Sequence, residues 1–388
     1  MPARVLIAVT HLLGSGHLVR AAQLARALTE AGFAVTLASG GMPLRDMAGE
    51  AFAFVQLPPV KVEGLDFRNL MDEAGAPVEA SRLARRRAML AALATTLKPD
   101  VVVTEHFPFG RRQLAEEFLT LITAAKAANP SALVLASVRD VLVTPRPDRI
   151  AEAEQRLSCL FDGVLVHGDR EFLPLEASWP VSAALAQRLH YTGYLAPPSV
   201  PASALAGGEG AGEVIVSGGG SAAALPLFRL CLDAARLGDA SRHWRILVGR
   251  GVAESDFDAL RQSASPNVTV ERVRADFPVL LARAALSISQ AGYNTVLDLV
   301  AAGRPAIVVP FDEGAETEQA VRAEAMEKAG LARCLRLSGP EPARPADLAA
   351  AVAAGLAQVS DLRLSIDLGG AERVGGLLTR LLAARARG

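Results

Sequence analysis

Short apolar runs alternate with amphipathic stretches along this chain. Residues 5–9 form the first apolar run, and Leu18, Ala22, Ala25 and Leu28 then recur at the spacing of one helix face. Similar runs predict strands at residues 33–37, 101–104, 133–137 and 163–166, with helices at 82–97 and 113–128. Strands that alternate with helices favour a parallel sheet covered on both faces by helices.

The alternation stops at residues 195–212, where proline and glycine dominate and predict a linker. It then resumes, with strands predicted at 213–217, 244–248, 268–271, 285–289 and 305–310, and helices at 221–236, 276–283, 294–302, 317–329 and 372–384. We therefore predict an α/β protein of two doubly wound, Rossmann-like parallel-sheet domains that face a cleft. The first domain covers residues 1–195, the linker 196–212 and the second domain 213–367, and residues 368–388 form a helix that packs back on the first domain.

Composition narrows the classes of function. Of 388 residues, 51% are apolar and 21% are charged, which excludes a disordered chain. The 40 basic residues balance 41 acidic ones, so the charge does not indicate a nucleic-acid-binding protein. The three cysteines lie far apart, which argues against a disulfide framework or a thiolate zinc site. No apolar run reaches the roughly 20 residues of a membrane span, and a cytoplasmic protein is predicted.

Polar residues follow the predicted strands of the first domain, where ligands of open α/β sheets bind. Gly14, Ser15 and Gly16 lie between the first strand and its helix, so backbone N–H groups can approach an anion such as phosphate. His17 comes next, and a histidine at a helix N-terminus tends to stay neutral and available as a base. Other predicted strands are followed by Glu105 and His106, by Arg139 and Asp140, and by His167. The alternative is a plain tight turn, with histidines that serve packing or lie on the surface.

A run of three glycines, Gly218 to Gly220, stands between a predicted strand and a predicted helix. Glycine loses more backbone entropy on folding than other residues, so such a run is typical of close approach to a ligand, here a phosphate. Competing motifs are weaker. The chain has no Walker-type loop, and a hydrolase pattern G-x-S-x-G ends in Ala223 instead of glycine. An NADP site built on Gly218, Gly220 and Arg250 stays open as an alternative, although no ribose-binding acid follows the next strand.

Polar side chains also follow two later strands of the second domain. Asn294 and Asp298 are four residues apart, so both can lie on one face of a predicted helix. Residues 311–319 then form a polar loop that ends in Gln319. Polar groups at neighbouring strand ends suit a ligand that carries several hydroxyls, whereas the acidic residues of the loop can also simply face water.

These last segments carry a family resemblance. The sequence ISQAGYNT at residues 288–295, GRPAIVVP at 303–310, and the later Glu318, Gln319 and Arg322 resemble the C-terminal domain of family 28 glycosyltransferases, the MurG-type group. The resemblance extends over residues 213–330. Residues 14–17 are similar to the family's N-terminal glycine loop, which ends in histidine. Residues 104–112 and 137–140 resemble a subgroup of predicted bacterial glycosyltransferases.

The resemblance implies a GT-B fold and a glycosyltransferase of the hexosyltransferase type, with the nucleotide-sugar donor on the second domain and the acceptor on the first. It implies that the donor contacts residues at the strand ends, namely Gly218, Gly219, Gly220, Ser221, Arg250, Val273, Gly292, Asn294, Thr295, Asp298, Glu318 and Gln319. The acceptor or its phosphate would lie against Gly14, Ser15, Gly16, Arg139 and Asp140. Asp298 stands where the family has a glutamate at the ribose, and Arg322 replaces an asparagine, which leaves the sugar open.

We expect an inverting, metal-independent transfer from a nucleoside-diphosphate sugar, with a UDP-sugar favoured, to an acceptor hydroxyl. The nucleotide sugar is then a substrate, and no cofactor is expected. His17 is the favoured general base, with Glu105 or His106 in reserve, and the glycine loop would stabilise the leaving diphosphate in place of a metal ion. A nucleotide-sugar epimerase or hydrolase on the same fold and a non-catalytic sugar-nucleotide-binding protein stay open as alternatives.

The acceptor stays open between a lipid-linked and a small molecule, and no nucleic-acid partner is expected. The predicted helix at residues 82–97 carries Arg82, Arg85, Arg86 and Arg87 among apolar residues. Such a helix can rest on an anionic membrane surface, which would place a cytoplasmic enzyme at the inner membrane face. The plainer interpretation is a solvated charged face over an ordinary core stripe.

Overall fold

A computed structural model describes residues 1–44, 47, 49–62, 69–143, 145–196, 200–220, 222–313, 316–357 and 366–387. The chain forms two compact units, one of residues 1–195 with 367–388 and the other of residues 196–366. The described part of the predicted linker therefore belongs to the second unit. There it includes the short helix η3 (Ala202–Ala204), whose Ala204 carbonyl accepts a hydrogen bond of 2.8 Å from Arg283 Nε.

The first unit is built on a parallel sheet of seven strands in the order β3-β2-β1-β4-β5-β6-β7. The strands are β1 (Arg4–Val9), β2 (Ala34–Ser39), β3 (Ala53–Gln56), β4 (Val101–Glu105), β5 (Leu133–Arg139), β6 (Gly163–His167) and β7 (Leu189–Tyr191). Successive residues of the central strands are buried on opposite faces, Leu6 and Val102 in one apolar cluster and Val5 and Val101 in another. Both faces are therefore covered, as a parallel sheet requires.

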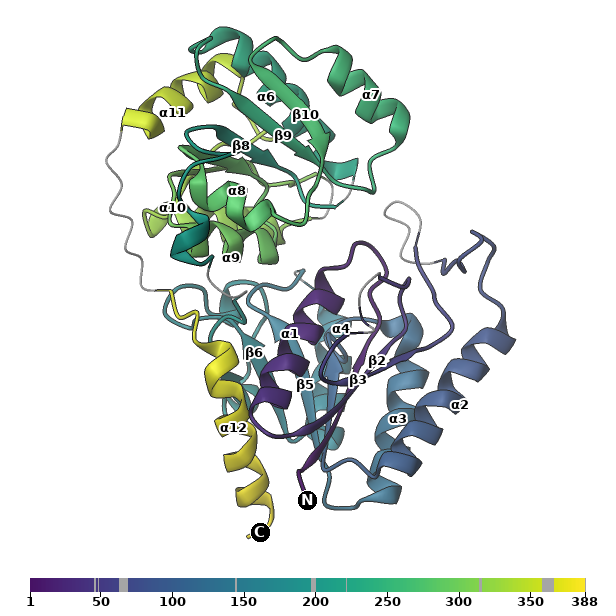
Figure 1. The fold of residues 1–388 in the computed structure, drawn as a ribbon. Coiled ribbons are helices and arrows are strands. Elements are labelled where there is room, and N and C mark those ends of the chain that lie inside the picture. Colours follow the sequence, from purple (N-terminus) through teal and green to yellow (C-terminus); the bar gives the residue numbers. More distant parts are fainter. Residues whose placement is uncertain are drawn as a thin grey trace. The chain divides into compact units, whose positions relative to one another are not determined.

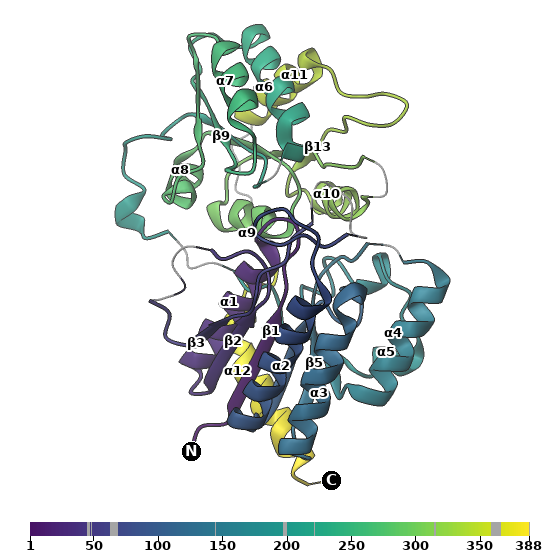
Figure 2. The ribbon, with the colours of Figure 1, turned by 90° about the vertical axis from the view of Figure 1, so that its right-hand side faces the viewer.

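Helices cover the two faces of this sheet (Figures 1 and 2). They are α1 (Gly16–Glu30), α2 (Ala80–Leu97), α3 (Ala115–Ala128), α4 (Pro147–Leu160), α5 (Ala183–Ala186) and α12 (Gly370–Arg385), with η1 (Arg112–Leu114) and η2 (Leu175–Ala177) between them. Figure 1 shows α12 alongside α1, and Val374 and Leu378 of α12 are buried in the same apolar cluster as α1. The C-terminal helix is thus part of the first unit.

One expectation about α2 is wrong. Arg86 is fully buried instead of lying on a basic surface: its Nε donates to Glu117 Oε2 at 2.7 Å and its Nη2 donates to Thr10 Oγ1 at 2.9 Å. Arg82 forms ion pairs with Glu73 and Asp72. Half of the four-arginine group therefore has partners within the protein. Across the described chain, no helix is both long and apolar enough to cross a lipid bilayer.

The second unit is built on a parallel sheet of six strands in the order β10-β9-β8-β11-β12-β13. The strands are β8 (Val214–Ser217), β9 (Trp244–Val248), β10 (Val268–Arg272), β11 (Leu286–Ser289), β12 (Ala306–Val308) and β13 (Arg333–Cys334). The helices are α6 (Leu225–Leu237), α7 (Glu254–Gln262), α8 (Phe277–Arg283), α9 (Tyr293–Ala302), α10 (Glu318–Lys328) and α11 (Pro345–Ala357). Helices α6 and α11 lie side by side, and Phe228, Trp244 and Leu348 share one buried cluster.

The helix predicted at residues 221–236 begins differently in the structure. A short helix η4 (Ala222–Ala224) precedes α6, and Pro226 stands in the first turn of α6. Proline has no N–H and fits the first turn of a helix but not its interior. The position of Pro226 therefore explains why α6 starts at Leu225.

Candidate functional site

A histidine and a carboxylate form the centre of the site in the first unit. His17 lies in the first turn of α1, and its Nδ1 is 2.9 Å from Oε1 of Glu105, the last residue of β4. The side chain of Glu105 is 1% exposed, and that of His17 is 12% exposed. Arg20 Nη2 is also 3.1 Å from Nδ1, but the Glu105 carboxylate is closer and is the stronger hydrogen-bond partner because it is charged. The carboxylate accepts a hydrogen bond from Nδ1–H, which leaves the lone pair of the neutral ring on Nε2. His17 can therefore take up a proton at Nε2.

Glu105 has its own hydrogen-bond donors. Arg20, one turn along α1 from His17, donates to Oε1, and Ser137 Oγ donates to Oε2 at 2.6 Å. Both carboxylate oxygens are thus occupied inside the protein. This argues against Glu105 as the reserve base and for a role in orienting His17. Sequence reasoning did not include Arg20, although its position three residues after His17 on one helix is a usable signal.

His17 is neutral at ordinary pH. Burial lowers its pKa well below 6.5, and the nearby charges of Arg111, Arg20 and Arg139 lower it further. The position of His17 at a helix N-terminus predicts the same neutral form, but for a different reason. In the structure the causes are desolvation and three arginines from α1, the end of β5 and the segment after β4.

His106 is held against His17 but lacks its carboxylate. The two ring centroids are 5.0 Å apart, and His106 has a left-handed backbone, with φ 66°. A Cβ at Gly110 would lie 2.4 Å from the His106 ring, so a larger residue there would displace the ring from this position. Within the described residues, Nδ1 of His106 is buried without a hydrogen-bond partner. His106 therefore has no group that fixes its tautomer through Nδ1, and His17 is the better base.

Of the residues predicted to bind a phosphate or the acceptor, one is bonded inside the protein and the others lie near His17 or at the start of α1. Asp140 is fully buried, and its Oδ2 accepts a hydrogen bond of 2.8 Å from the hydroxyl of Tyr194. Its carboxylate is therefore bonded to another residue inside the protein. Arg139 lies close enough to lower the pKa of both His17 and His106. Gly14 has φ +64°, and Ser15, the N-cap of α1, makes no side-chain capping hydrogen bond. Backbone N–H groups of the first turn remain available to an anion.

In the second unit, the three glycines after β8 differ in why they are glycine. A Cβ at Gly218 would lie 2.2 Å from the Ala224 Cβ, so packing requires glycine there. Gly219 has φ +70°, which other residues rarely adopt. Gly220 has neither constraint, because a Cβ there would meet nothing within 4 Å. The loop backbone is therefore open at Gly219 and Gly220, and the predicted Ser221 lies outside the described residues.

The loop after β9 packs against this glycine loop. A Cβ at Gly249 would lie 2.3 Å from the Gly219 carbonyl oxygen, and Gly251 N donates to the Gly220 carbonyl at 3.0 Å. Arg250 stands between these two glycines with an exposed side chain. Directly after β10, the N–H of Val273 donates to the Val248 carbonyl at 3.0 Å, so this N–H already has a protein partner.

Helix α9 presents polar groups that lack protein partners. Asp298 is half-buried and forms neither a hydrogen bond nor an ion pair with any described residue, and burial raises its pKa to about 6. Oδ1 of Asn294 is buried, likewise without a partner in the described part of the chain. Gly292 is the N-cap of α9 and Thr295 lies in its first turn, half-buried. A ligand with hydroxyl groups would satisfy these atoms.

Two side chains of α10 hold the loop that precedes α9. Gln319 Oε1 accepts hydrogen bonds from Ala291 N at 3.1 Å and Phe311 N at 3.0 Å. Arg322 is buried, and its Nη1 donates to the Ala291 carbonyl at 2.8 Å. The amide oxygen of Gln319 therefore ties two loops together. Glu318 at the start of α10 is also buried.

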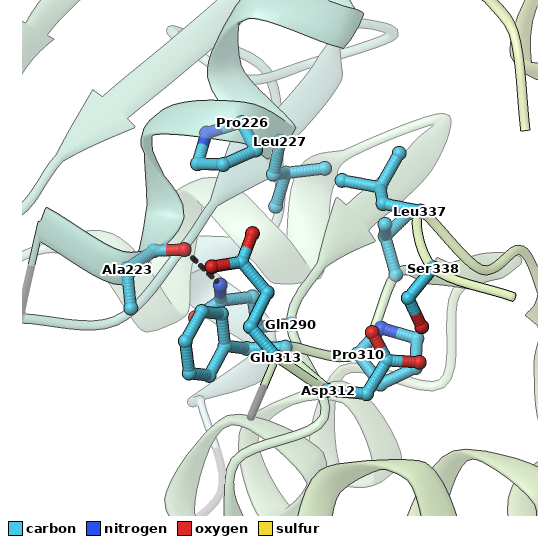
Figure 3. Close-up of a pocket in the computed structure, with 11 residues that line it drawn as sticks. Ala223, Pro226, Leu227, Gln290, Pro310, Asp312, Glu313, Leu337 and Ser338 are labelled. Atoms are coloured by element: carbon cyan, nitrogen blue, oxygen red, sulfur yellow. Dashed lines mark hydrogen bonds between the residues drawn. The ribbon is translucent and has the colours of Figure 1, made fainter. Parts of the chain in front are cut away.

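A pocket lies beside this loop, between the start of α6 and the segment after β12 (Figure 3). Gln290 Nε2 crosses it to donate to the Ala223 carbonyl at 2.9 Å, and Glu313 and Leu337 form part of its wall. None of the described donor-site candidates lines this pocket. The sequence carried no signal for it, because its walls come from four separate segments of the second unit.

Both units have the architecture of GT-B glycosyltransferases, and solved members of that class share the fold of the whole chain. The calicheamicin glycosyltransferase CalG4 matches with a TM-score of 0.64 at 18% identity, covering 99% of each chain. The glycosyltransferase VinC in complex with dTDP matches with 0.62 at 16%, covering 99% of this chain and 100% of VinC. MurG of Acinetobacter baumannii matches with 0.57 at 15%, covering 100% of each chain.

The second unit matches a known family model. Residues 214–358 match the model of the glycosyltransferase family 28 C-terminal domain. Curated relatives named UDP-N-acetylglucosamine–N-acetylmuramyl-(pentapeptide) pyrophosphoryl-undecaprenol N-acetylglucosamine transferase match part of the chain. The Paramagnetospirillum magneticum protein is 34% identical over 158 residues, 39% of this chain and 42% of that protein. The Cronobacter sakazakii protein is 35% identical over 136 residues, 35% of this chain and 38% of that protein. The chain spans about two fifths of these relatives' length.

Proposed function

We propose that the chain is an inverting glycosyltransferase that moves a sugar from a nucleoside-diphosphate sugar to an acceptor hydroxyl. The observation that carries the proposal is the family 28 C-terminal domain at residues 214–358, in which Gly219 and Gly220 leave an open backbone at the carboxyl edge of the sheet. The names of the curated relatives include UDP-N-acetylglucosamine. This supports a UDP-sugar as the favoured donor.

On the donor side, Gly219 and Gly220 would approach the diphosphate through backbone N–H groups. Arg250, in the adjoining loop, would add a side-chain cation. Asp298 and Asn294 would bind hydroxyl groups of the ribose. Oδ1 of Asn294 is buried and the Asp298 carboxylate is half-buried, and neither has a partner among the described residues, which supports this role because a ligand hydroxyl supplies a donor.

On the acceptor side, Nε2 of His17 would take the proton of the attacking hydroxyl. The hydroxyl oxygen then forms a bond to the anomeric carbon while the bond from that carbon to the phosphate oxygen breaks on the opposite face. The nucleoside diphosphate leaves with an added negative charge. Backbone N–H groups and Arg250 would stabilise that charge, so we propose that the transfer requires no metal ion.

The acceptor would carry a phosphate. Uncapped N–H groups at the start of α1 and the charge of Arg139 support this class. The names of the curated relatives include a pyrophosphoryl-undecaprenol acceptor, which belongs to the same class. A cytoplasmic location, with membrane contact through such a lipid-linked acceptor, is part of the proposal.

A thermal-shift panel tests the donor site. UDP, GDP, dTDP, CDP and NADP are each added at about 100 times the expected Kd, where a bound ligand stabilises the fold by about 2.7 kcal/mol. We expect a selective response to UDP. A response to NADP alone would overturn the transferase proposal in favour of a dinucleotide site.

Turnover with the selected nucleotide sugar and a lipid phosphate acceptor tests the base. His17→Ala should lower kcat by about 100-fold or more while nucleotide binding stays unchanged, as expected for loss of a general base. A His17→Ala enzyme with the wild-type kcat would contradict the assignment. Loss of turnover in EDTA, with recovery on adding Mg²⁺, would contradict the metal-free step.

A further inference from the structure

Behind Glu105, a row of buried polar side chains crosses the carboxyl ends of neighbouring strands. Ser137 on β5 is the register partner of Glu105 on β4, and its Oγ is 2.6 Å from Glu105 Oε2. His167 at the end of β6 places Nε2 3.1 Å from the same Ser137 oxygen. Its Nδ1 lies 2.9 Å from Oγ1 of Thr192. Ser137, His167 and Thr192 are each at most 2% exposed.

Counting protons gives one consistent direction for these hydrogen bonds. Ser137 has one hydroxyl proton, and the Glu105 carboxylate at 2.6 Å is its stronger acceptor because that bond is charge-assisted. The Ser137 oxygen can then only accept from His167, which requires the proton of His167 on Nε2. Burial lowers the pKa of His167 to about 3, so at neutral pH its ring carries a single proton. In this arrangement Nδ1 of His167 accepts a hydrogen bond from the hydroxyl of Thr192.

In this arrangement every donor points toward Glu105. The chain runs from Thr192 through His167 and Ser137 to Oε2, and it leaves Oε1 to Arg20 and to His17 Nδ1–H. Hydrogen bonds in a buried series polarise and orient one another. We propose that His167, acting through Ser137, is a positioning residue that holds the Glu105 carboxylate as the acceptor of the His17 Nδ1–H and so keeps Nε2 of His17 free to take a proton. The inference rests on the proposed role of His17.

A competing arrangement exists at the far end of the chain. Thr192 Oγ1 is also 2.6 Å from the Gly193 carbonyl oxygen. If the Thr192 proton lies there, His167 carries its proton on Nδ1 and turns the Nε2 lone pair toward the Ser137 oxygen. His167 would then donate no hydrogen bond to Ser137. The two arrangements differ in one observable, the tautomer of His167.

Nitrogen-15 NMR of the histidine rings distinguishes them without any ligand. The full-length chain is labelled at its six histidines and recorded at pH 7.5, and single-histidine variants assign the signals. We expect His167 to carry its proton on Nε2 and His17 to carry its proton on Nδ1. His167 with its proton on Nδ1 would overturn the proposal.

Variants then test the connection to His17. In His167→Met and in Ser137→Ala, the two ring nitrogen signals of His17 should move toward each other as the second tautomer becomes populated. His167→Gln retains an N–H near the position of Nε2 and should restore the wild-type spectrum of His17. An unchanged His17 spectrum in both His167→Met and Ser137→Ala would refute the positioning role.

His190→Met is the matched control. His190 lies on β7 beside β6 and is half-buried, and its ring forms no hydrogen bond with the described residues. The control should leave the His17 signals in place. Thermal unfolding checks each variant, and Ser137→Ala, which removes a single oxygen, keeps the test valid if His167→Met fails to fold. If no nucleotide stabilises the protein in the thermal-shift panel, the proposed function fails, but the tautomers of His17 and His167 measured by NMR are unaffected. The failure of the proposed function and the failure of the positioning role are therefore distinguishable.

Discussion

Replacing Arg250 with alanine tests the donor site directly. Its backbone is fixed beside the glycine loop, because Gly251 N donates to the Gly220 carbonyl at 3.0 Å. Its side chain is exposed and forms no ion pair or hydrogen bond with the part of the chain that the structure describes. The substitution therefore removes no internal contact, and any effect on nucleotide binding reports a contact with the ligand.

The expected magnitude follows from the exposure of Arg250. A hydrogen bond to a charged group contributes about 1.5–3 kcal/mol, and solvent screening at an exposed site favours the lower end. About 1.4 kcal/mol corresponds to a tenfold change in Kd. Arg250→Ala should therefore weaken UDP binding about tenfold, and more at low salt than at high salt because exposed charges are screened.

Isothermal titration with UDP and with uridine provides the assay. Uridine lacks the diphosphate, so its affinity should be the same for the wild type and Arg250→Ala. Arg333→Ala is the control, because Arg333 on β13 is also exposed and its side chain has no hydrogen-bond or ion-pair partner among the described residues. The reasoning is refuted if Arg250→Ala binds UDP like the wild type, or if Arg333→Ala loses as much affinity. A loss confined to NADP would favour the dinucleotide alternative.

Three further predictions concern stability. Burial raises the pKa of Asp298 to about 6, from about 4 in the unfolded chain, so the associated stability is present below pH 4 and is lost as the pH rises through 6. Asp298→Asn should therefore raise the free energy of unfolding in urea by about 2 kcal/mol at pH 7.5 and change it little at pH 4; an equal effect at both pH values would contradict this. Arg86→Met leaves Glu117 buried without its partner and should lower the free energy of unfolding by about 3–5 kcal/mol, whereas Arg85→Met at an exposed position should change it by less than about 0.5 kcal/mol; similar losses would refute the buried ion pair. Gly249→Ala should lower the melting temperature because its Cβ would meet the Gly219 carbonyl at 2.3 Å, and Gly220→Ala should leave it unchanged; a destabilised Gly220→Ala would mean that packing requires this glycine.

The sequence predicts the strands at the centre of each sheet because they are buried on both faces and read as unbroken apolar runs. The edge strands β3, β7 and β13 were not predicted. They are short, and their residues are largely half-exposed, so they carry no such run. Helix α11 was also not predicted, because its alanine-rich sequence shows little periodic contrast between apolar and polar positions.

In the first unit, the rule that ligands bind at strand ends identifies candidate residues that lie close together in the structure. It does not predict which of them form hydrogen bonds with each other. His17 and Glu105 were both candidates, and the structure pairs them. Asp140 carried the same signal, yet its carboxylate binds Tyr194 inside the protein. Whether a polar side chain at a strand end faces a ligand or the interior depends on residues distant in sequence, here 54 positions away. Pattern alone cannot supply that information.

In the glycine loop of the second unit, the structure distinguishes residues that the sequence treats alike. In the sequence, Gly218, Gly219 and Gly220 are equivalent members of one run, and the whole run was taken as a phosphate cradle. The structure separates them, because contact with Ala224 requires the first and a positive φ requires the second. Folding gives no reason for the third. Among the described residues neither constraint applies to Gly220, and under the proposed function a donor that approaches the backbone closely would account for glycine at this position.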